Sequence, residues 1–170
     1  MHSRIYLIGF MGSGKTTHGK KIARMMGYDF LDMDEWISEK EGKTIPEIFA
    51  EEGESRFREL ETAAIKATNQ LQQVVIATGG GLPCHGNNMQ MLKASGLTIY
   101  LKLTPEALLS RLKESKTKRP LLEGKSEEEM FATIREMLTA REPWYNQADM
   151  TIDGLGRVNE RVVNAIQRQK

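Results

Sequence analysis

The chain has 170 residues, of which 39% are hydrophobic and 28% charged, and its formal net charge is +1. This length suits one domain with one core, and the charge excludes a general electrostatic attraction to nucleic acid or membranes. No apolar run is long enough to span a membrane, and the single cysteine, Cys84, excludes an internal disulfide and suits a reducing compartment. We therefore expect a cytoplasmic protein, without a signal peptide because Met1-His2-Ser3-Arg4 leads directly into a predicted strand.

The first feature in chain order is a glycine-rich stretch between a strand predicted over residues 4–8 and a helix predicted over residues 15–26. It reads Gly9-Phe10-Met11-Gly12-Ser13-Gly14-Lys15-Thr16 and fits G-x-x-x-x-G-K-[ST], whose backbone N–H groups and helix N-terminus bind phosphates. We expect Lys15 to reach the β- and γ-phosphates and the Thr16 hydroxyl to ligate Mg²⁺. A chance glycine-rich turn is the alternative, and the flanking strand and helix argue against it.

Two aspartates follow the second predicted strand, which spans residues 28–32 after a helix stop at Gly27. Asp32 and Asp34 are two residues apart, so in an extended chain their carboxylates face the same side and Met33 points away. Near a bound phosphate, one carboxylate can hold Mg²⁺ through water and the other can orient or deprotonate an attacking hydroxyl. Helix capping is the alternative interpretation.

Three consecutive glycines follow the third predicted strand. Before that strand we predict three helices. The first spans residues 34–41, the second begins at a capping box at Thr44 and is interrupted by Gly53, and the third spans residues 54–70. The β-branched run over residues 74–78 is typical of a strand buried on both faces. It ends in Gly79-Gly80-Gly81. Three glycines would let a ligand approach the backbone closely, and a flexible turn is the alternative interpretation.

The remaining chain continues the alternation of strands and helices. We predict helices over residues 87–94, 104–114, 126–141 and 158–168, with Pro143 ending the third, and strands over residues 97–103 and 150–152. Residues 115–125 are polar and lack an apolar period, so we predict a mobile loop there. The pattern predicts an α/β fold with a five-stranded parallel sheet, and ligands bind such sheets at the carboxyl ends of the strands.

Three arginines lie near the predicted breaks between helices: Arg58, Arg119 and Arg141. A guanidinium suits bidentate binding of carboxylate or phosphate. Spacing alone does not distinguish these three from solvated surface charges, because the chain contains 24 lysines and arginines.

Together these motifs resemble those of the shikimate kinases, and the similarity covers nearly the whole chain. The resemblance depends on the order and spacing of all the motifs rather than on any one of them. They are the glycine-rich stretch G-F-M-G-S-G-K-T, Asp32-x-Asp34, Ile45-Pro46-Glu47-Ile48-Phe49, Gly53-Glu54-x-x-Phe57-Arg58-x-x-Glu61, Thr78-Gly79-Gly80-Gly81, Arg119-Pro120-Leu121-Leu122 and Arg141-x-Pro143-x-Tyr145.

The resemblance implies a three-layer α/β/α P-loop kinase fold with a mobile lid and substrate-binding helices. It implies a single domain over residues 1–170, with a substrate-binding region at about 33–61 and a lid at about 112–125. The implied reaction is ATP-dependent phosphorylation of the shikimate 3-hydroxyl, which gives shikimate 3-phosphate and ADP on the way to chorismate and the aromatic amino acids. The implied cofactor is Mg²⁺, and the implied state is a monomer without nucleic-acid or membrane partners.

The resemblance also assigns roles to residues. Asp34 would bind the shikimate hydroxyls and act as base, while Lys15 and Arg119 would be the other catalytic residues. The remaining assignments are nucleotide contacts at Gly12, Ser13, Gly14, Lys15, Thr16, Thr17 and Arg119, metal contacts at Thr16 and Asp32, shikimate contacts at Arg58, Gly80 and Arg141, adenine-side positions at Arg111 and Asp153-Gly154, and pocket or core positions at Phe49, Phe57 and Leu122. We expect His18 at the surface.

Other functions fit parts of the pattern. A gluconate kinase or a nucleoside monophosphate kinase would share the phosphate loop and the lid, but the aspartate pair, the glycine triplet and the two arginines together argue against both. A nucleotide-dependent switch normally carries N-K-x-D, which the sequence lacks. An inactive regulator is disfavoured because Lys15, Asp34 and Arg119 are all intact.

Overall fold

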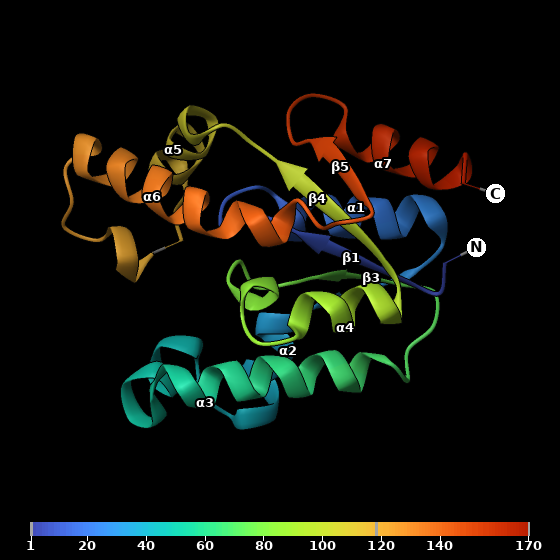
Figure 1. The fold of residues 1–170 in the computed structure, drawn as a ribbon, viewed down its shortest axis with the longest axis horizontal. Helices are drawn as coiled ribbons and strands as arrows, with labels where there is room; N and C mark the ends of the chain where they lie inside the picture. Colours follow the sequence, from blue (N-terminus) through green and yellow to red (C-terminus); the bar gives the residue numbers. More distant parts are fainter. Residues whose placement is uncertain (1, 118, 170) are drawn as a thin grey trace.

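The computed structural model describes residues 2–117 and 119–169, and its strands form one five-stranded parallel sheet (Figure 1). The order across the sheet is β2-β3-β1-β4-β5, and every neighbouring pair is parallel. The predicted sheet is therefore confirmed. The strands are β1 (Arg4–Ile8), β2 (Asp29–Asp32), β3 (Val74–Ala77), β4 (Leu97–Lys102) and β5 (Met150–Asp153).

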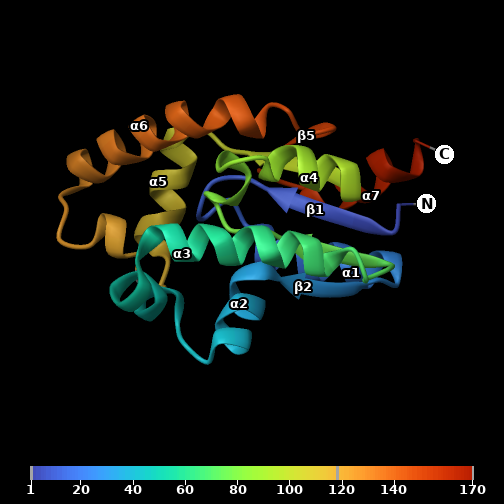
Figure 2. The ribbon, with the colours of Figure 1, turned by 60° about the horizontal axis from the view of Figure 1, so that its bottom comes forward.

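Helices cover both faces of this sheet (Figures 1 and 2). They are α1 (Lys15–Met26), α2 (Met33–Glu41), α3 (Ile45–Thr68), α4 (Asn88–Ser95), α5 (Pro105–Glu114), α6 (Glu127–Tyr145) and α7 (Val158–Gln167), with short 3₁₀ turns η1 (Leu82–Cys84) and η2 (Pro120–Leu122). Within the described ranges, no helix has both the length and the apolar character needed to cross a membrane.

The central strand β1 shows why the strands read as continuous apolar runs. Ile5 and Leu7 pack into a cluster with α1 and α7 on one face. Tyr6 and Ile8 pack into the larger cluster on the other face, together with α2, α3, α4 and α6. All four side chains are fully buried, because alternate residues of a strand point to opposite faces and both faces are covered. This central position puts the residues that follow Ile8 in the middle of the carboxyl edge of the sheet.

The predicted helix ends are set by local chemistry. Gly27 and Gly42 end α1 and α2 in the left-handed conformation, with φ of 69° and 65°. Capping boxes at Thr44 and Ser126 begin α3 and α6, as the sequence indicated. Gly53, with φ of 82°, interrupts α3 where the sequence predicted a break, so the first part of α3 turns away from the part that carries Arg58.

The predicted end of α6 before Pro143 is wrong, because the helix continues to Tyr145. Proline inside a helix removes one backbone hydrogen bond and crowds the preceding turn. The last turn is nevertheless held by tertiary contacts. The buried Tyr145 ring packs on Tyr100 at a centroid distance of 5.1 Å, and its hydroxyl donates to the Gly80 carbonyl. The Asn146 N–H also donates to the Glu142 carbonyl at 2.8 Å.

The segment predicted as a mobile loop over residues 115–125 contains the short helix η2. The Leu122 N–H donates to the Arg119 carbonyl at 2.9 Å, and the Leu122 side chain is buried in the larger core cluster. One buried leucine therefore anchors a polar segment that has no apolar period. Position 118 of the predicted lid lies outside the described residues.

The contact between β4 and the segment before β5 gives a test of stability. Thr98 is fully buried on β4, and its hydroxyl both donates to Asp149 Oδ2 at 2.8 Å and accepts from the Asp149 N–H at 3.0 Å. We expect Thr98→Val to lower the free energy of unfolding by about 1–3 kcal/mol, because both Asp149 groups lose a partner. Urea denaturation measures this change. Thr151→Val, an exposed change on the edge strand β5, is the control and should stay within about 0.5 kcal/mol; equal losses would contradict the interpretation.

Candidate active site

The phosphate loop joins β1 to α1 at the centre of the carboxyl edge. Gly9, Gly12 and Gly14 take φ of 148°, 79° and 91°, in the region that favours glycine, which explains their places in the motif. The loop lies at a pocket of about 690 Å³, which is also lined by Thr16, Thr17 and residues of the lid segment. Its volume and its helix N-terminus suit a nucleotide with its phosphates.

Lys15 is held inside this loop. Its ammonium group donates to the carbonyl oxygens of Gly9 and Phe10 at 2.8 and 2.9 Å. Burial lowers the pKa of Lys15 to about 8, and the nearby carboxylate of Asp34 opposes this shift. Negatively charged phosphate oxygens would stabilise the ammonium form, so the site is prepared for an anion.

Thr16 and Asp32 lie together as the sequence predicted. The Thr16 hydroxyl donates to Asp32 Oδ2 at 2.6 Å, and Asp32 Oδ1 accepts from the N–H groups of Asp34 and Glu35 at the start of α2. Asp32 therefore caps α2 with one oxygen and faces the phosphate loop with the other. A hydroxyl and a carboxylate are hard oxygen donors that fit Mg²⁺. Across residues 2–117 and 119–169 no group of three or more His, Cys, Asp or Glu forms a metal cage, so phosphates and water would supply the other ligands.

Asp34 turns from the first turn of α2 toward the glycine triplet. Asp32 and Asp34 both line the larger pocket and Met33 is buried away from it, as predicted, although α2 already begins at Met33 and the chain there is not extended. Asp34 Oδ1 is buried and has no hydrogen-bond partner among the described residues. Burial raises the pKa of Asp34, the Asp32 carboxylate raises it further, and Lys15 opposes the shift. A carboxylate with a free oxygen and a raised pKa suits a general base.

Two carboxylates pack against the first glycine of the triplet. A Cβ on Gly79 would lie 2.9 Å from Asp34 Oδ1 and 3.1 Å from Glu61 Oε2. These separations are shorter than real Cβ atoms tolerate without movement. Glycine therefore allows both carboxylates to approach the backbone closely here.

Two arginines pack against the other glycines. A Cβ on Gly80 would lie 3.2 Å from Arg141 Nη1, and a Cβ on Gly81 would lie 2.9 Å from Arg58 Nη1. Arg58 comes from α3 and Arg141 from α6, so two helices remote in sequence place their guanidinium groups on one turn. This arrangement distinguishes these two residues from the other arginines, which spacing alone did not.

The arginine pair lines a second, smaller pocket of about 190 Å³. It shares with the phosphate-loop pocket the lining residues Met11, Asp34, Gly79, Gly80 and Arg119. A small anion in the second pocket would therefore lie next to phosphates in the first. A further groove of about 520 Å³ beside β5 contains none of the residues predicted to bind shikimate or phosphate.

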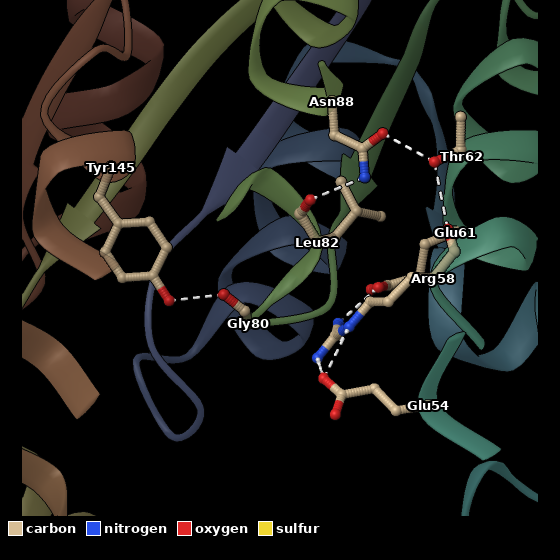
Figure 3. Close-up of polar contacts among 8 residues, drawn as sticks. All are labelled: Glu54, Arg58, Glu61, Thr62, Gly80, Leu82, Asn88 and Tyr145. Carbon is tan, nitrogen blue, oxygen red and sulfur yellow. Dashed lines mark hydrogen bonds and ion pairs between the residues drawn. The ribbon is translucent and has the colours of Figure 1, made fainter. Parts of the chain in front are cut away.

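Glu61 is a site residue that the sequence analysis quoted in a motif without giving it a role. It is only 1% exposed, and Arg58 Nη1 donates to its Oε1 at 2.5 Å (Figure 3). Burial raises the pKa of Glu61 to about 7, and the Arg58 charge opposes this shift. Its position three residues after Arg58 on α3 was the available signal, because side chains at that spacing share one face of a helix.

The predicted pocket residues divide between pocket and core. Phe57 is buried, lines the smaller pocket and packs on the more exposed Phe49 at a centroid distance of 4.8 Å. Leu122 lies in the core, and its neighbour Leu121 lines the pocket instead. Arg119 also lines both pockets, from the lid segment.

The predicted adenine-side residues lie together beside the phosphate loop. Arg111 donates to the carbonyl oxygens of Ser13 and Gly154 at 3.2 and 3.0 Å. His18 is half-buried rather than fully at the surface, lines the larger pocket and lies 2.8 Å from Asn159 Oδ1 through its Nδ1. Two elements remote from the loop, α5 and α7, thus close this end of the pocket.

Comparison with models of protein families matches residues 11–169 to the shikimate kinase family. The chain belongs to the shikimate kinase family. The shikimate kinase of Parabacteroides distasonis is 43% identical over 163 residues, which are 96% of this chain and 94% of that protein. The shikimate kinase of Thermodesulfovibrio yellowstonii is 44% identical over 162 residues, which are 95% of this chain and 91% of that protein.

Solved shikimate kinases have the same fold. The enzyme of Bacteroides thetaiotaomicron aligns with a TM-score of 0.92 and 39% identity, covering 99% of this chain and 98% of that one. The enzyme of Acinetobacter baumannii, solved in complex with shikimate, aligns with a TM-score of 0.89 and 36% identity, covering 99% and 94%. The predicted family, the P-loop kinase fold and the class of enzyme, an ATP-dependent kinase, are confirmed. The roles of individual residues stay predictions.

Glu61 gives this kinase a testable pH dependence of stability. Because its pKa rises from 4.5 to about 7 on folding, the folded protein keeps a proton that the unfolded chain has lost. The stability due to this group is present below pH 4.5 and is lost as the pH rises to about 7. Between these limits we expect the unfolding free energy of the wild type to fall by about 1–3 kcal/mol relative to Glu61→Gln.

Urea denaturation at a series of pH values measures this difference. Glu59→Gln, at an exposed position on the same helix, makes the same chemical change and is the control. A difference between wild type and Glu61→Gln that stays constant across the range, or that changes in the opposite direction, would contradict the prediction.

Proposed function

We propose that this chain transfers the γ-phosphoryl group of ATP to the 3-hydroxyl of shikimate, giving shikimate 3-phosphate and ADP for the synthesis of chorismate and the aromatic amino acids. One observation carries the proposal: the phosphate-loop pocket and the smaller pocket lined by the two arginines share Gly79 and Gly80. Membership of the family and the fold shared with a shikimate kinase solved with shikimate support it.

The donor is held by the phosphate loop. We assign the nucleotide phosphates to Lys15, to the backbone of Gly12-Ser13-Gly14 and to the hydroxyls of Thr16 and Thr17. Thr16 and Asp32, 2.6 Å apart, would hold Mg²⁺. When bound, this ion supplies positive charge that neutralises phosphate oxygens.

The acceptor is held by the smaller pocket. Arg58 and Arg141 would bind the shikimate carboxylate from two helices, and the Gly80 backbone would contact the ring. Glu61 already orients the Arg58 guanidinium at 2.5 Å, and the Arg141 guanidinium lies 5.5 Å from the centre of the Phe10 ring. Both cations are thus fixed before the substrate arrives, which reduces the entropy lost on binding.

The transfer step uses the free oxygen of Asp34. Asp34 accepts the proton of the 3-hydroxyl while the 3-hydroxyl oxygen forms a bond to the γ-phosphorus. At the same time the bond from the γ-phosphorus to the β–γ bridging oxygen breaks. Lys15 and Arg119 stabilise the negative charge that develops on the transferring group and on ADP. Positioning supplies most of the catalysis in this kind of reaction.

We also assign functional regions. Residues 33–61 would bind the acceptor, and residues 112–125 would close as a lid that brings Arg119 to the phosphates and excludes water, the competing acceptor. We also propose that the protein acts as a monomer. The single cysteine supports action in the cytoplasm.

A coupled assay of ADP release tests the proposed function. We expect ATP turnover with shikimate and little with gluconate or a nucleoside monophosphate. Turnover with either of these, but none with shikimate, would contradict the proposal. ATP hydrolysis that shikimate leaves unchanged would favour a nucleotide-dependent switch.

Asp34→Asn tests the base. The amide keeps the shape of the side chain but cannot accept the proton in the same way, so we expect kcat to fall by about 10²–10⁴ while ATP affinity stays nearly unchanged. Steady-state kinetics and calorimetry measure the two effects. Asp32→Asn is the matched variant and should weaken binding of ATP with Mg²⁺ instead. The opposite pattern would exchange the roles of the two aspartates.

Arg58→Ala tests the carboxylate contact. We expect shikimate binding to weaken by about 2–5 kcal/mol, because the shikimate carboxylate and Glu61 both lose a partner in a desolvated site. Calorimetry in the presence of a non-hydrolysable ATP analogue measures the affinity. Arg56→Ala removes an arginine that forms surface ion pairs on the same helix, and it should have little effect. An unchanged affinity in Arg58→Ala would exclude Arg58 from the contact.

A further inference from the structure

Two side chains outside both pockets hold residues 79–82, called the glycine turn below, from opposite sides (Figure 3). The Tyr145 hydroxyl of α6 donates to the Gly80 carbonyl at 2.5 Å. The Asn88 amide, at the start of α4, donates to the Leu82 carbonyl at 2.9 Å. Tyr145 and Asn88 are 0% and 1% exposed, so removing the hydroxyl or the amide takes a buried partner from each carbonyl.

Each of these bonds leads to one of the two arginines. Tyr145 lies four residues after Arg141, so the two side chains are neighbours on the same face of α6. On the other side, the Thr62 hydroxyl of α3 shares its proton between Asn88 Oδ1 at 2.8 Å and the Arg58 carbonyl at 3.1 Å (Figure 3). The turn is therefore connected to α6 beside Arg141 and to α3 at Arg58.

We propose that Tyr145 and the Thr62–Asn88 pair are positioning residues that set the separation of Arg58 and Arg141 by fixing the glycine turn between their helices. Both guanidinium groups approach this turn closely, because they border the space that a Cβ on Gly80 or Gly81 would occupy. The distance between the two guanidinium groups therefore depends on the position of the turn. The inference rests on the proposed function, because that separation matters only if the pair binds one carboxylate.

The turn also lies against the phosphate loop. A Cβ on Gly80 would be 3.4 Å from the Met11 nitrogen and 3.6 Å from the Gly9 carbonyl oxygen. The peptide that Tyr145 holds is therefore placed between the donor and acceptor pockets. Displacing it changes where the acceptor lies relative to the γ-phosphate, while the contacts within the phosphate loop remain.

Tyr145→Phe removes the hydroxyl and keeps the ring that packs on Tyr100. We expect the KM for shikimate to rise about tenfold, which corresponds to one lost buried hydrogen bond, and the Kd of an ATP analogue to stay within about twofold. We also expect more ADP than shikimate 3-phosphate to form, because a misplaced acceptor allows water to react. A merely structural role would not change this ratio of products.

Tyr100→Phe is the matched control. It also removes a buried tyrosine hydroxyl, one that lies 3.4 Å from Glu142 and does not contact the glycine turn. We expect its KM for shikimate and its product ratio to equal those of the wild type. Equal kinetic changes in both tyrosine variants, compared at temperatures where both are folded, would overturn the inference.

Thr62→Val tests the opposite side and serves even if Tyr145→Phe fails to fold. We expect a higher KM for shikimate and excess ADP, again with unchanged binding of the ATP analogue. Wild-type values for both quantities would overturn the role of the Thr62–Asn88 pair. If the wild type itself does not phosphorylate shikimate, the proposed function fails; if it does and the variants match the wild type, only this inference fails.

Discussion

The close approach of charged side chains to three consecutive glycines is the constraint on which the rest of the site depends. Gly79 faces two carboxylates, and Gly80 and Gly81 each face a guanidinium group, at separations that a Cβ would crowd. The turn follows β3, the neighbour of β1, so Gly79 and Gly80 also line the phosphate-loop pocket. The donor and acceptor pockets meet at Gly79 and Gly80, where the backbone carries no side chain between them.

This arrangement buries charges before any substrate is present. Burial lowers the pKa of Lys15 to about 8, raises the pKa of Glu61 to about 7 and raises the pKa of Asp34. Each shift records a charged group that lacks part of its hydration. In the proposed reaction, the phosphates supply the opposite charge that Lys15 lacks, and the substrates bind to groups already in place.

Elements with local causes were predictable. The bounds of β1 and α1 match the prediction because a buried apolar run, the phosphate loop and a left-handed glycine fix them. Long-range contacts caused the failures. Pro143 does not end α6, because the Tyr145 hydroxyl donates to the Gly80 carbonyl and holds the last turn. The short helix η2 forms in a polar loop because the Leu122 side chain is buried in the core. Neither contact leaves a periodic signal in the sequence.

The sequence by itself determined the phosphate loop, the order of strands and helices and the family, because a phosphate-binding turn and its flanking elements are contiguous along the chain. It also singled out Asp34 from its place after the second strand, whereas Arg58 and Arg141 were distinguished only through resemblance. Tertiary structure alone decided that both arginines face one turn, that Tyr145 holds Gly80, and that Asn88 holds Leu82 directly after the glycines. These relations depend on how α3, α4 and α6 pack around β3, and no local spacing encodes that packing.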